Sequence, residues 1–183
     1  MSIGRMLLCV MAVSFIGASV EGMPFEKGRK EFSVSTGFGL NHRFPTATKS
    51  KLKFDVADLR WGKFSSDRSQ KAIELCAGDV IEGNDNLITC ATASHRRYFM
   101  LRDKTALAWE LGIGLAHLEH RVPELGSRLN FTEQAGIIFQ RKLSPNTALT
   151  FNYRFFHVSN AGLTRPNIGL NSSMVTVGYT QFR

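Results

Sequence analysis

A histidine and a serine near the end of the chain are the clearest candidates for chemistry. His157 and Ser159 are two residues apart, so on a β-strand both side chains point to the same face. A serine hydroxyl beside an imidazole can act as a nucleophile that a general base activates. Taken alone, a His-x-Ser pair is a weak signal, because most such pairs are ordinary polar residues at a strand end.

Glu133 is a third polar residue whose position needs an explanation. A hairpin centred on Pro145 would place residue 133 directly opposite His157. Glu133 shares its face with Phe131, a face expected to contact lipid, where a lone carboxylate is costly. Two explanations stay open: Glu133 interacts with His157, or it lies close enough to the membrane surface for water to solvate it.

The elements that would position these residues have a period of two. At 105–116, bulky side chains alternate with Ala, Gly and Glu, and similar alternation recurs elsewhere in the chain. This period indicates β-strands rather than helices. The strand at 50–60 changes face between Val56 and Leu59, so we expect a β-bulge there. Eight strands are predicted, near residues 31–40, 50–60, 70–80, 87–101, 105–118, 130–141, 147–158 and 171–182.

The two faces of these strands favour an all-β fold, an eight-stranded antiparallel transmembrane β-barrel. The bulky aromatic faces suit lipid, and the small or polar faces suit a narrow interior. Eight is an even number, and closure removes the exposed strand edges. The connections at 119–129 and 160–170 are longer than those at 102–104 and 142–146. With a periplasmic N-terminus, the longer connections would face the outside of the cell, as outer-membrane barrels have them.

The first 22 residues are expected to be a signal peptide, which leaves 23–183 as the barrel. The apolar run at 6–20 is short for a membrane span but has the size of a signal-peptide core. Export exposes Cys76 and Cys90 to oxidising conditions, so one disulfide is allowed. A hairpin centred on Gly83 would place the two cysteines opposite each other. Bridged and free cysteines both stay open, because the turn centre rests on the pattern alone.

Composition and motifs narrow the classes of function. The chain has 23 Lys and Arg against 15 Asp and Glu, a net charge of +8, which suits an anionic partner. A nucleic-acid binder is disfavoured, because the sequence has no basic helix or zinc motif and its start predicts export. His42, His95, His117 and His120 lack metal-ligand spacing, so we expect no metal and no cofactor.

The segment around His157 and Ser159 carries a more specific signal. The run His157-Val-Ser159-Asn160-Ala161-Gly162, followed by Pro166-Asn167-x-Gly169-x-Asn171, resembles the signature of the outer-membrane lipid A 3-O-deacylase (PagL) family. A similar stretch begins at Trp109, so the resemblance covers about residues 109–183. It implies an outer-membrane serine esterase that hydrolyses the ester-linked acyl chain at the 3 position of lipid A in lipopolysaccharide. It leaves homodimerisation open.

The resemblance also implies roles for individual residues. Ser159 would be the nucleophile and His157 the general base. The acidic residue that orients the histidine in the family falls at Asn171, and an asparagine can fix the tautomer but supplies no charge. Glu133 is the alternative source of that charge. A non-enzymatic barrel, adhesive or structural, is the rival function. Residues that would shape the oxyanion site or bind substrate are Asn160, Gly162 and Asn167.

Overall fold

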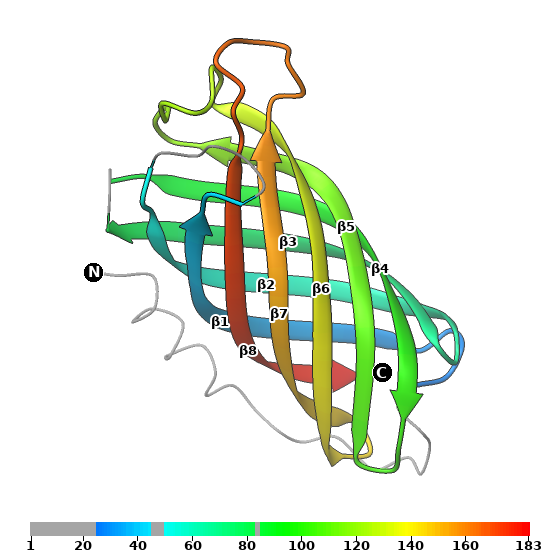
Figure 1. Cartoon of the computed structure of the whole chain (residues 1–183). Helices are drawn as coiled ribbons and strands as arrows, with labels where there is room; N and C mark the ends of the chain where they lie inside the picture. The colour runs from blue at the N-terminus through cyan, green and yellow to red at the C-terminus, as the bar shows by residue number, and fades with distance from the viewer. Residues whose placement is uncertain (1–24, 45–49, 83–84) are drawn as a thin grey trace.

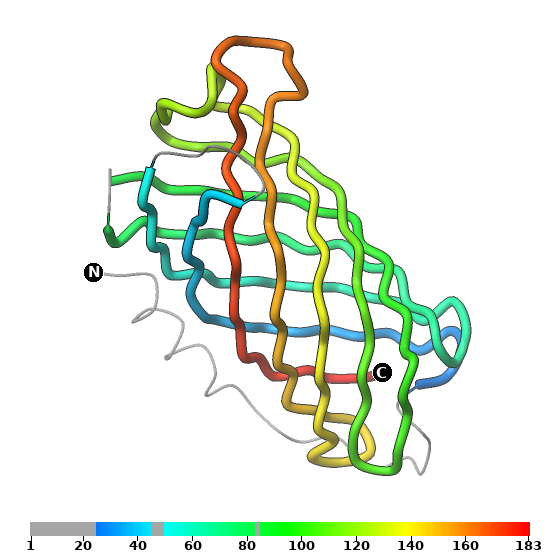
Figure 2. The backbone as a smooth tube through the Cα atoms, viewed as in Figure 1, coloured from blue at the N-terminus to red at the C-terminus, as the bar shows by residue number. Residues whose placement is uncertain are grey.

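The computed structural model describes residues 25–44, 50–82 and 85–183, which form a closed antiparallel barrel of eight strands (Figure 1). Each strand pairs with its sequence neighbours, and the last closes on the first (Figure 2). The predicted fold class is confirmed, and the predicted signal peptide lies outside the described residues. No helix among the residues described is long and apolar enough to cross a membrane. The strands are β1 (Lys30–His42), β2 (Lys53–Ser66), β3 (Ser69–Glu82), β4 (Leu87–Leu101), β5 (Thr105–Leu118), β6 (Leu129–Ser144), β7 (Thr147–Ser159) and β8 (Leu170–Phe182).

Alternation along each strand separates a bulky outer surface from a tightly filled interior. On β5, Leu111 and Ile113 project outward with 54% and 63% of their surface exposed, whereas Ala108 and Ala116 are fully buried. A closed barrel of eight strands has an interior just wide enough for side chains. Bulky residues therefore take the outer face, where lipid replaces water, and small or polar residues point inward.

Two apolar clusters close the ends of the interior. One packs Phe54, Phe156 and Met174 beneath the loop residues Val122 and Leu125. The other gathers the rings of Phe25, Phe64, Tyr98 and Phe182 at the opposite end. These clusters fill both ends of the interior within the part of the chain that the structure describes. A reaction would therefore take place on the outer surface or at the loops rather than in a central channel.

A buried ionic network fills the middle of the barrel. Arg60 Nη2 lies 2.7 Å from Glu110 Oε2, and Arg96 Nε lies 3.0 Å from the same oxygen. Arg154 donates to Glu74 through its two terminal guanidinium nitrogens, Nη1 and Nη2. Charged groups that are taken out of water need partners of this kind, because an unpaired buried charge is strongly destabilising. The network therefore links strands across the interior.

The expected β-bulge in the second strand is absent, and this prediction was wrong. Burial alternates regularly from Phe54 to Phe64, and the shifts in register with β3 lie at the strand ends. Phe54 and Val56 point into the apolar cluster inside the barrel, whereas Leu59 and Trp61 point outward. The apparent change of face arose because the barrel interior is itself apolar near one end and ionic in the middle.

Cys76 and Cys90 form a disulfide between β3 and β4. The two residues are directly opposite in the register of this hairpin, as a turn centred on residue 83 requires. The sequence pattern had left the bridge undecided, and the structure resolves it. The disulfide ties together two neighbouring strands next to the apolar cluster, to which both cysteines belong.

The connections differ in length between the two ends of the barrel. At the short-turn end, β2 and β3, β4 and β5, and β6 and β7 are joined by two or three residues. At the long-loop end, the connections at 119–128 and 160–169 rise above the strands and lie side by side (Figures 1 and 2). The predicted asymmetry is present. Outer-membrane barrels have short periplasmic turns and longer extracellular loops, so we infer that the long-loop end faces outward.

Candidate active site

His157 lies near the long-loop end of β7, in a row that crosses three strands. Glu133 is directly opposite it on β6, and Asn171 is directly opposite it on β8. The predicted pairing of Glu133 with His157 is therefore present. Directly opposite residues of an antiparallel pair have Cβ atoms about 4.5–5.5 Å apart, so side chains from both neighbours can reach the imidazole.

Asn171 occupies the Nδ1 edge of the imidazole. Its Oδ1 lies 2.5 Å from His157 Nδ1. An amide oxygen can only accept, so Nδ1 carries the proton and donates it in this hydrogen bond. In the neutral ring, Nε2 is then unprotonated and can accept a proton. Asn171 is fully buried, which holds its side chain in place.

Glu133 approaches the opposite edge of the ring. Its Oε2 lies 3.8 Å from His157 Nε2, and 53% of its side chain is exposed. This separation exceeds hydrogen-bond distance, so any action of the carboxylate on the ring has to come from its charge. Water weakens such an exposed interaction. Of the two candidate partners, Asn171 is placed to fix the tautomer, and Glu133 faces the nitrogen that would exchange a proton.

Ser159 is the last residue of β7 and lies opposite Phe131 on β6. Its side chain shares the outer face of the strand with His157 and is partly exposed. No hydrogen bond joins Ser159 Oγ to the imidazole within the part of the chain that the structure describes. Catalytic hydrogen bonds are often long before substrate binds, so this geometry is compatible with a nucleophile and its base.

Gly169 presses against the imidazole from the loop that follows. Its φ is +82°, in the left-handed region that favours glycine. A Cβ at this position would lie 2.8 Å from His157 Cε1, closer than side-chain atoms pack. In the structure, its missing side chain leaves room for the histidine ring.

Asn160 organises the loop between β7 and β8 rather than presenting free donors. Its side chain is buried, and Nδ2 donates to Thr164 Oγ1 at 2.8 Å. Its Oδ1 accepts from the backbone N–H of Gly162 at 3.0 Å, and its own backbone N–H donates to Asn167 Oδ1 at 2.9 Å. Gly162 has a φ of +79° and is exposed at the loop tip.

Asn167 is the predicted oxyanion residue that keeps unengaged donors. Neither its backbone N–H nor its Nδ2 donates a hydrogen bond to any of the residues that the structure describes. Its Oδ1 is used to hold Asn160, which fixes the side chain. Asn167 therefore combines a fixed position with two donors that a ligand can use.

The loop at 119–128 is hydrogen-bonded to the loop at 160–169 and holds it in place. Gly126 donates its backbone N–H to Pro166 O at 2.6 Å, and Ile168 donates to Glu124 O at 2.9 Å. The Glu124 carboxylate is buried and accepts from the backbone N–H and the hydroxyl of Ser50, both at 2.8 Å. No pattern marks Glu124 in the sequence, because its role depends on loops that meet only in the folded barrel.

A shallow groove of about 500 Å³ runs down the outer surface below this row. Ala135 and Ile137 follow Glu133 on the same face of β6, and Tyr153 comes from β7. Within the described residues, no group of three or more His, Cys, Asp or Glu side chains is placed to hold a metal ion.

The fold and the outer surface together define the class of protein. It is an outer-membrane β-barrel that carries an imidazole and a hydroxyl at its outer rim. The lipid A 3-O-deacylase (PagL) family model matches residues 36–180, and the chain belongs to this family. It is therefore a lipid A deacylase of the outer membrane. The comparisons give no support to the homodimer.

Solved structures share the architecture. The crystal structure of the outer-membrane enzyme PagL is 21% identical with a TM-score of 0.61, covering 81% of this chain and 97% of that one. Neisserial surface protein A is 12% identical with a TM-score of 0.66, covering 85% and 99%. OprG from Pseudomonas aeruginosa is 9% identical with a TM-score of 0.55, covering 88% and 99%. No curated protein matches the sequence significantly.

Proposed function

We propose that the protein removes the ester-linked acyl chain at the 3 position of lipid A by a serine-esterase mechanism. The observation that carries this proposal is the arrangement around His157. Asn171 holds Nδ1 at 2.5 Å, which leaves Nε2 unprotonated on the strand face that Ser159 shares. An oriented base beside a hydroxyl is the arrangement by which serine hydrolases activate their nucleophile.

The reaction would proceed through an acyl-enzyme. His157 Nε2 takes the Ser159 proton as Oγ attacks the ester carbonyl carbon and forms a tetrahedral intermediate. The intermediate collapses when the bond to the sugar oxygen breaks, and the imidazolium returns the proton to that oxygen. Water, deprotonated by Nε2, then attacks the acyl-enzyme, and the proton passes back to Oγ as the fatty acid leaves.

The developing charges would be stabilised from two sides. Asn167, with its free backbone N–H and Nδ2, is the candidate donor to the oxyanion. Asn160 would act indirectly, because its hydrogen bonds hold the loop that carries Asn167. Glu133, 3.8 Å from Nε2, would stabilise the imidazolium by charge while Asn171 keeps the ring in its orientation.

The groove below the row suits an acyl chain. Its walls include the outward side chains of Trp109, Ile137 and Tyr153, and the small Ala135, which also lines it, is the next outward residue after Glu133 on β6. A chain lying along this face would remain in contact with apolar surface while its ester reaches the rim. The substrate would then approach from the lipid rather than from the barrel interior.

Mass spectrometry of lipid A after incubation with the purified, folded protein tests this proposal. We expect the loss of one ester-linked acyl chain, located at the 3 position by fragmentation. Ser159→Ala should lose on the order of 10³-fold or more in rate, since members of such a unit fail together. Ser65→Ala, at the short-turn end, is the matched control. Near-normal release by the Ser159→Ala protein would refute the mechanism, and no release by the wild type would favour a non-enzymatic barrel.

A further inference from the structure

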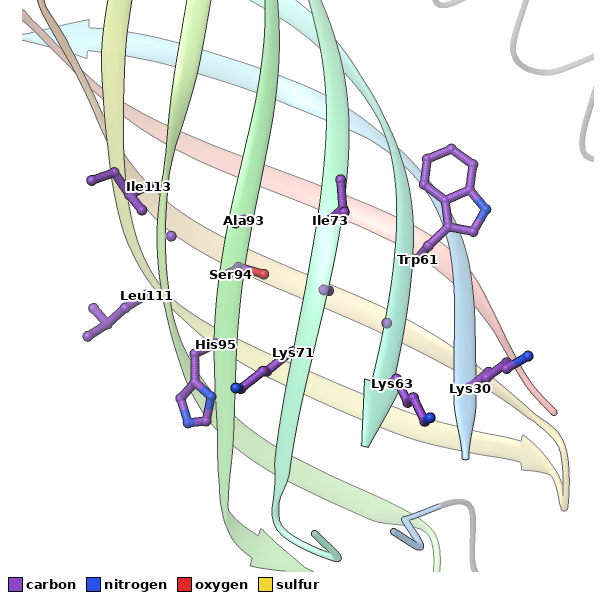
Figure 3. Close-up of a pocket in the computed structure, with 13 residues that line it drawn as sticks. Lys30, Trp61, Lys63, Lys71, Ile73, Ala93, Ser94, His95, Leu111 and Ile113 are labelled. Carbon is purple, nitrogen blue, oxygen red and sulfur yellow. The ribbon is translucent and has the colours of Figure 1, made fainter. Parts of the chain in front are cut away.

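Three lysines and a histidine form a continuous row on the outer surface, away from the candidate active site. Lys30 on β1 is directly opposite Lys63 on β2, which is opposite Lys71 on β3, which in turn is opposite His95 on β4. Figure 3 shows the four side chains at one level across neighbouring strands. The row therefore spans four strands without interruption.

This row has no counter-charge of its own. Like charges directly opposite each other destabilise a sheet. Lys30, Lys63 and Lys71 form no ion pair with any residue in the described ranges 25–44, 50–82 and 85–183, and all three are exposed. The buried carboxylates of Glu31 and Glu74 point into the barrel and are engaged with Arg60 and Arg154. An external anion would relieve the repulsion.

An apolar groove adjoins the row, whose four residues line one end of it. It has a volume of about 750 Å³ and lies on the outward faces of β2 to β5. Small Ala93 sits between Ile73 and Ile113, its register partners, and Trp61 stands at one side (Figure 3). Ile73 and Ile113 are 60% and 63% exposed, so the groove is open to the surrounding lipid.

With the long loops facing outward, the three lysines of the row lie near the short-turn end, on the side of the inner leaflet. Lys63 lies three residues before the end of β2 and Lys71 two residues after the start of β3, about 7–10 Å along the strand from the short turn. Trp61, one step above Lys63, is the kind of aromatic residue that marks a membrane interface. The acyl chains of a phospholipid whose phosphate binds the row would reach the groove.

We propose that this surface is a binding site for an anionic glycerophospholipid of the inner leaflet. The lysine row holds the phosphate and its headgroup, and one acyl chain lies in the groove over Ala93. This site is separate from the hydrolytic site, because the row lies at the short-turn end and His157 at the long-loop end.

A second copy of the chain does not fit the surface as well. Two copies in one membrane are related by an axis along the membrane normal, so a symmetric contact brings the same patch against itself. The lysine row would then face its own copy at the same depth. A phospholipid supplies the opposite charge together with apolar chains, and both parts of the surface are satisfied.

Fluorescence of Trp61 provides the test. The chain has two tryptophans, so Trp109→Phe leaves Trp61 as the only reporter. This protein is folded into phosphatidylcholine vesicles that contain increasing fractions of dibrominated phosphatidylglycerol or dibrominated phosphatidylcholine, whose bromines quench on contact. We expect phosphatidylglycerol to bind on the order of tenfold more strongly at Trp61, with a preference that weakens in high salt.

Two double variants, made in the Trp109→Phe protein, distinguish binding at the lysine row from a general attraction between a basic protein and an anionic lipid. Lys63→Gln/Lys71→Gln removes two charges from the row. The ratio of phosphatidylglycerol binding to phosphatidylcholine binding at Trp61 should then fall to about one. Lys27→Gln/Lys104→Gln removes two exposed charges at the same end outside the row, and the preference should persist. If the first double variant does not fold, Lys71→Gln alone should reduce the preference severalfold.

Three results would overturn the proposal. One is equal quenching by the two lipids in the parent protein, and another is the same preference in all variants. The third is Trp61 shielded from both lipids at high protein density, which would indicate a second copy on this face. None of these readouts depends on hydrolysis, so they are independent of the proposed enzymatic function.

Discussion

Replacing Gly169 with alanine should disable the site by displacing the imidazole while the barrel stays intact. The new Cβ would lie 2.8 Å from His157 Cε1, at least 0.6 Å short of the 3.4 Å at which ordinary contact begins. The ring must move by about that amount, which strains its 2.5 Å hydrogen bond to Asn171. Misplacement of a catalytic group by about 1 Å can cost about 10²-fold in rate.

The backbone strain of this substitution can be controlled separately. Alanine at a φ of +82° is disfavoured by about 1–2 kcal/mol wherever it occurs. Gly28 has a φ of +89°, and a Cβ there would meet nothing within 4 Å. Gly28→Ala should therefore show a similar loss of stability with normal activity, whereas Gly169→Ala should lose about 10²-fold in rate.

The assay is the initial rate of fatty-acid release from lipopolysaccharide. Each rate is divided by the fraction of folded protein, which is measured by the shift in gel mobility on heating. The free energy of unfolding of both variants, measured in urea, shows whether their strain is comparable. If Gly169→Ala releases fatty acid within threefold of Gly28→Ala, the position of the ring does not limit the reaction, and the geometric reasoning fails.

Further substitutions test the partners of the imidazole and the barrel itself. Asn171→Asp supplies the missing negative charge beside Nδ1 and should raise the rate about tenfold or more, whereas Asn171→Ala should lower it by about 10²–10⁴. Equal rates for the wild type and both variants would show that the residue does not orient the ring. Glu133→Gln should lower the rate by no more than about tenfold, because exposed ion pairs contribute about 0–1 kcal/mol, and a thousandfold loss would make Glu133 the essential acid. Cys76→Ser/Cys90→Ser should lower the free energy of unfolding in urea by about 3 kcal/mol, from the loop that the disulfide closes; an unchanged unfolding midpoint would contradict this. Arg154→Ala should cost about 3–5 kcal/mol by the same measurement, because it removes the cation that binds both Glu74 oxygens and leaves the buried carboxylate with the more distant Arg60, at 3.6 Å. A neutral outcome would mean that water reaches the network.

The hairpin of β6 and β7 was predictable because its information is local. Strict alternation identified both strands, and the turn at Pro145 fixed their register, which placed Glu133 opposite His157. The same reasoning placed Cys76 opposite Cys90, although it could not decide whether they bond. A one-residue change of register would move every side chain to the other face, so the pattern constrains the pairing strongly.

The contents of the barrel interior required the tertiary structure. In β2, Phe54 and Val56 point inward although most apolar residues of the barrel point outward, because this end of the interior is filled by an apolar cluster. The contacts of Arg154 with Glu74 join strands separated by 80 residues in sequence. Such contacts depend on which side chains meet across the closed barrel, and a pattern read along one strand carries no information about them.

The sequence alone determined the strands, their order, the faces of His157 and Ser159 and the two candidate partners of the imidazole. Only the tertiary structure decided that Asn171 takes Nδ1, that Glu133 faces Nε2 and that Gly169 packs against the ring. The physical reason is one of scale. Alternation specifies a face and a register over several ångströms, whereas a hydrogen bond is decided within a few tenths of an ångström by packing among segments distant in the chain.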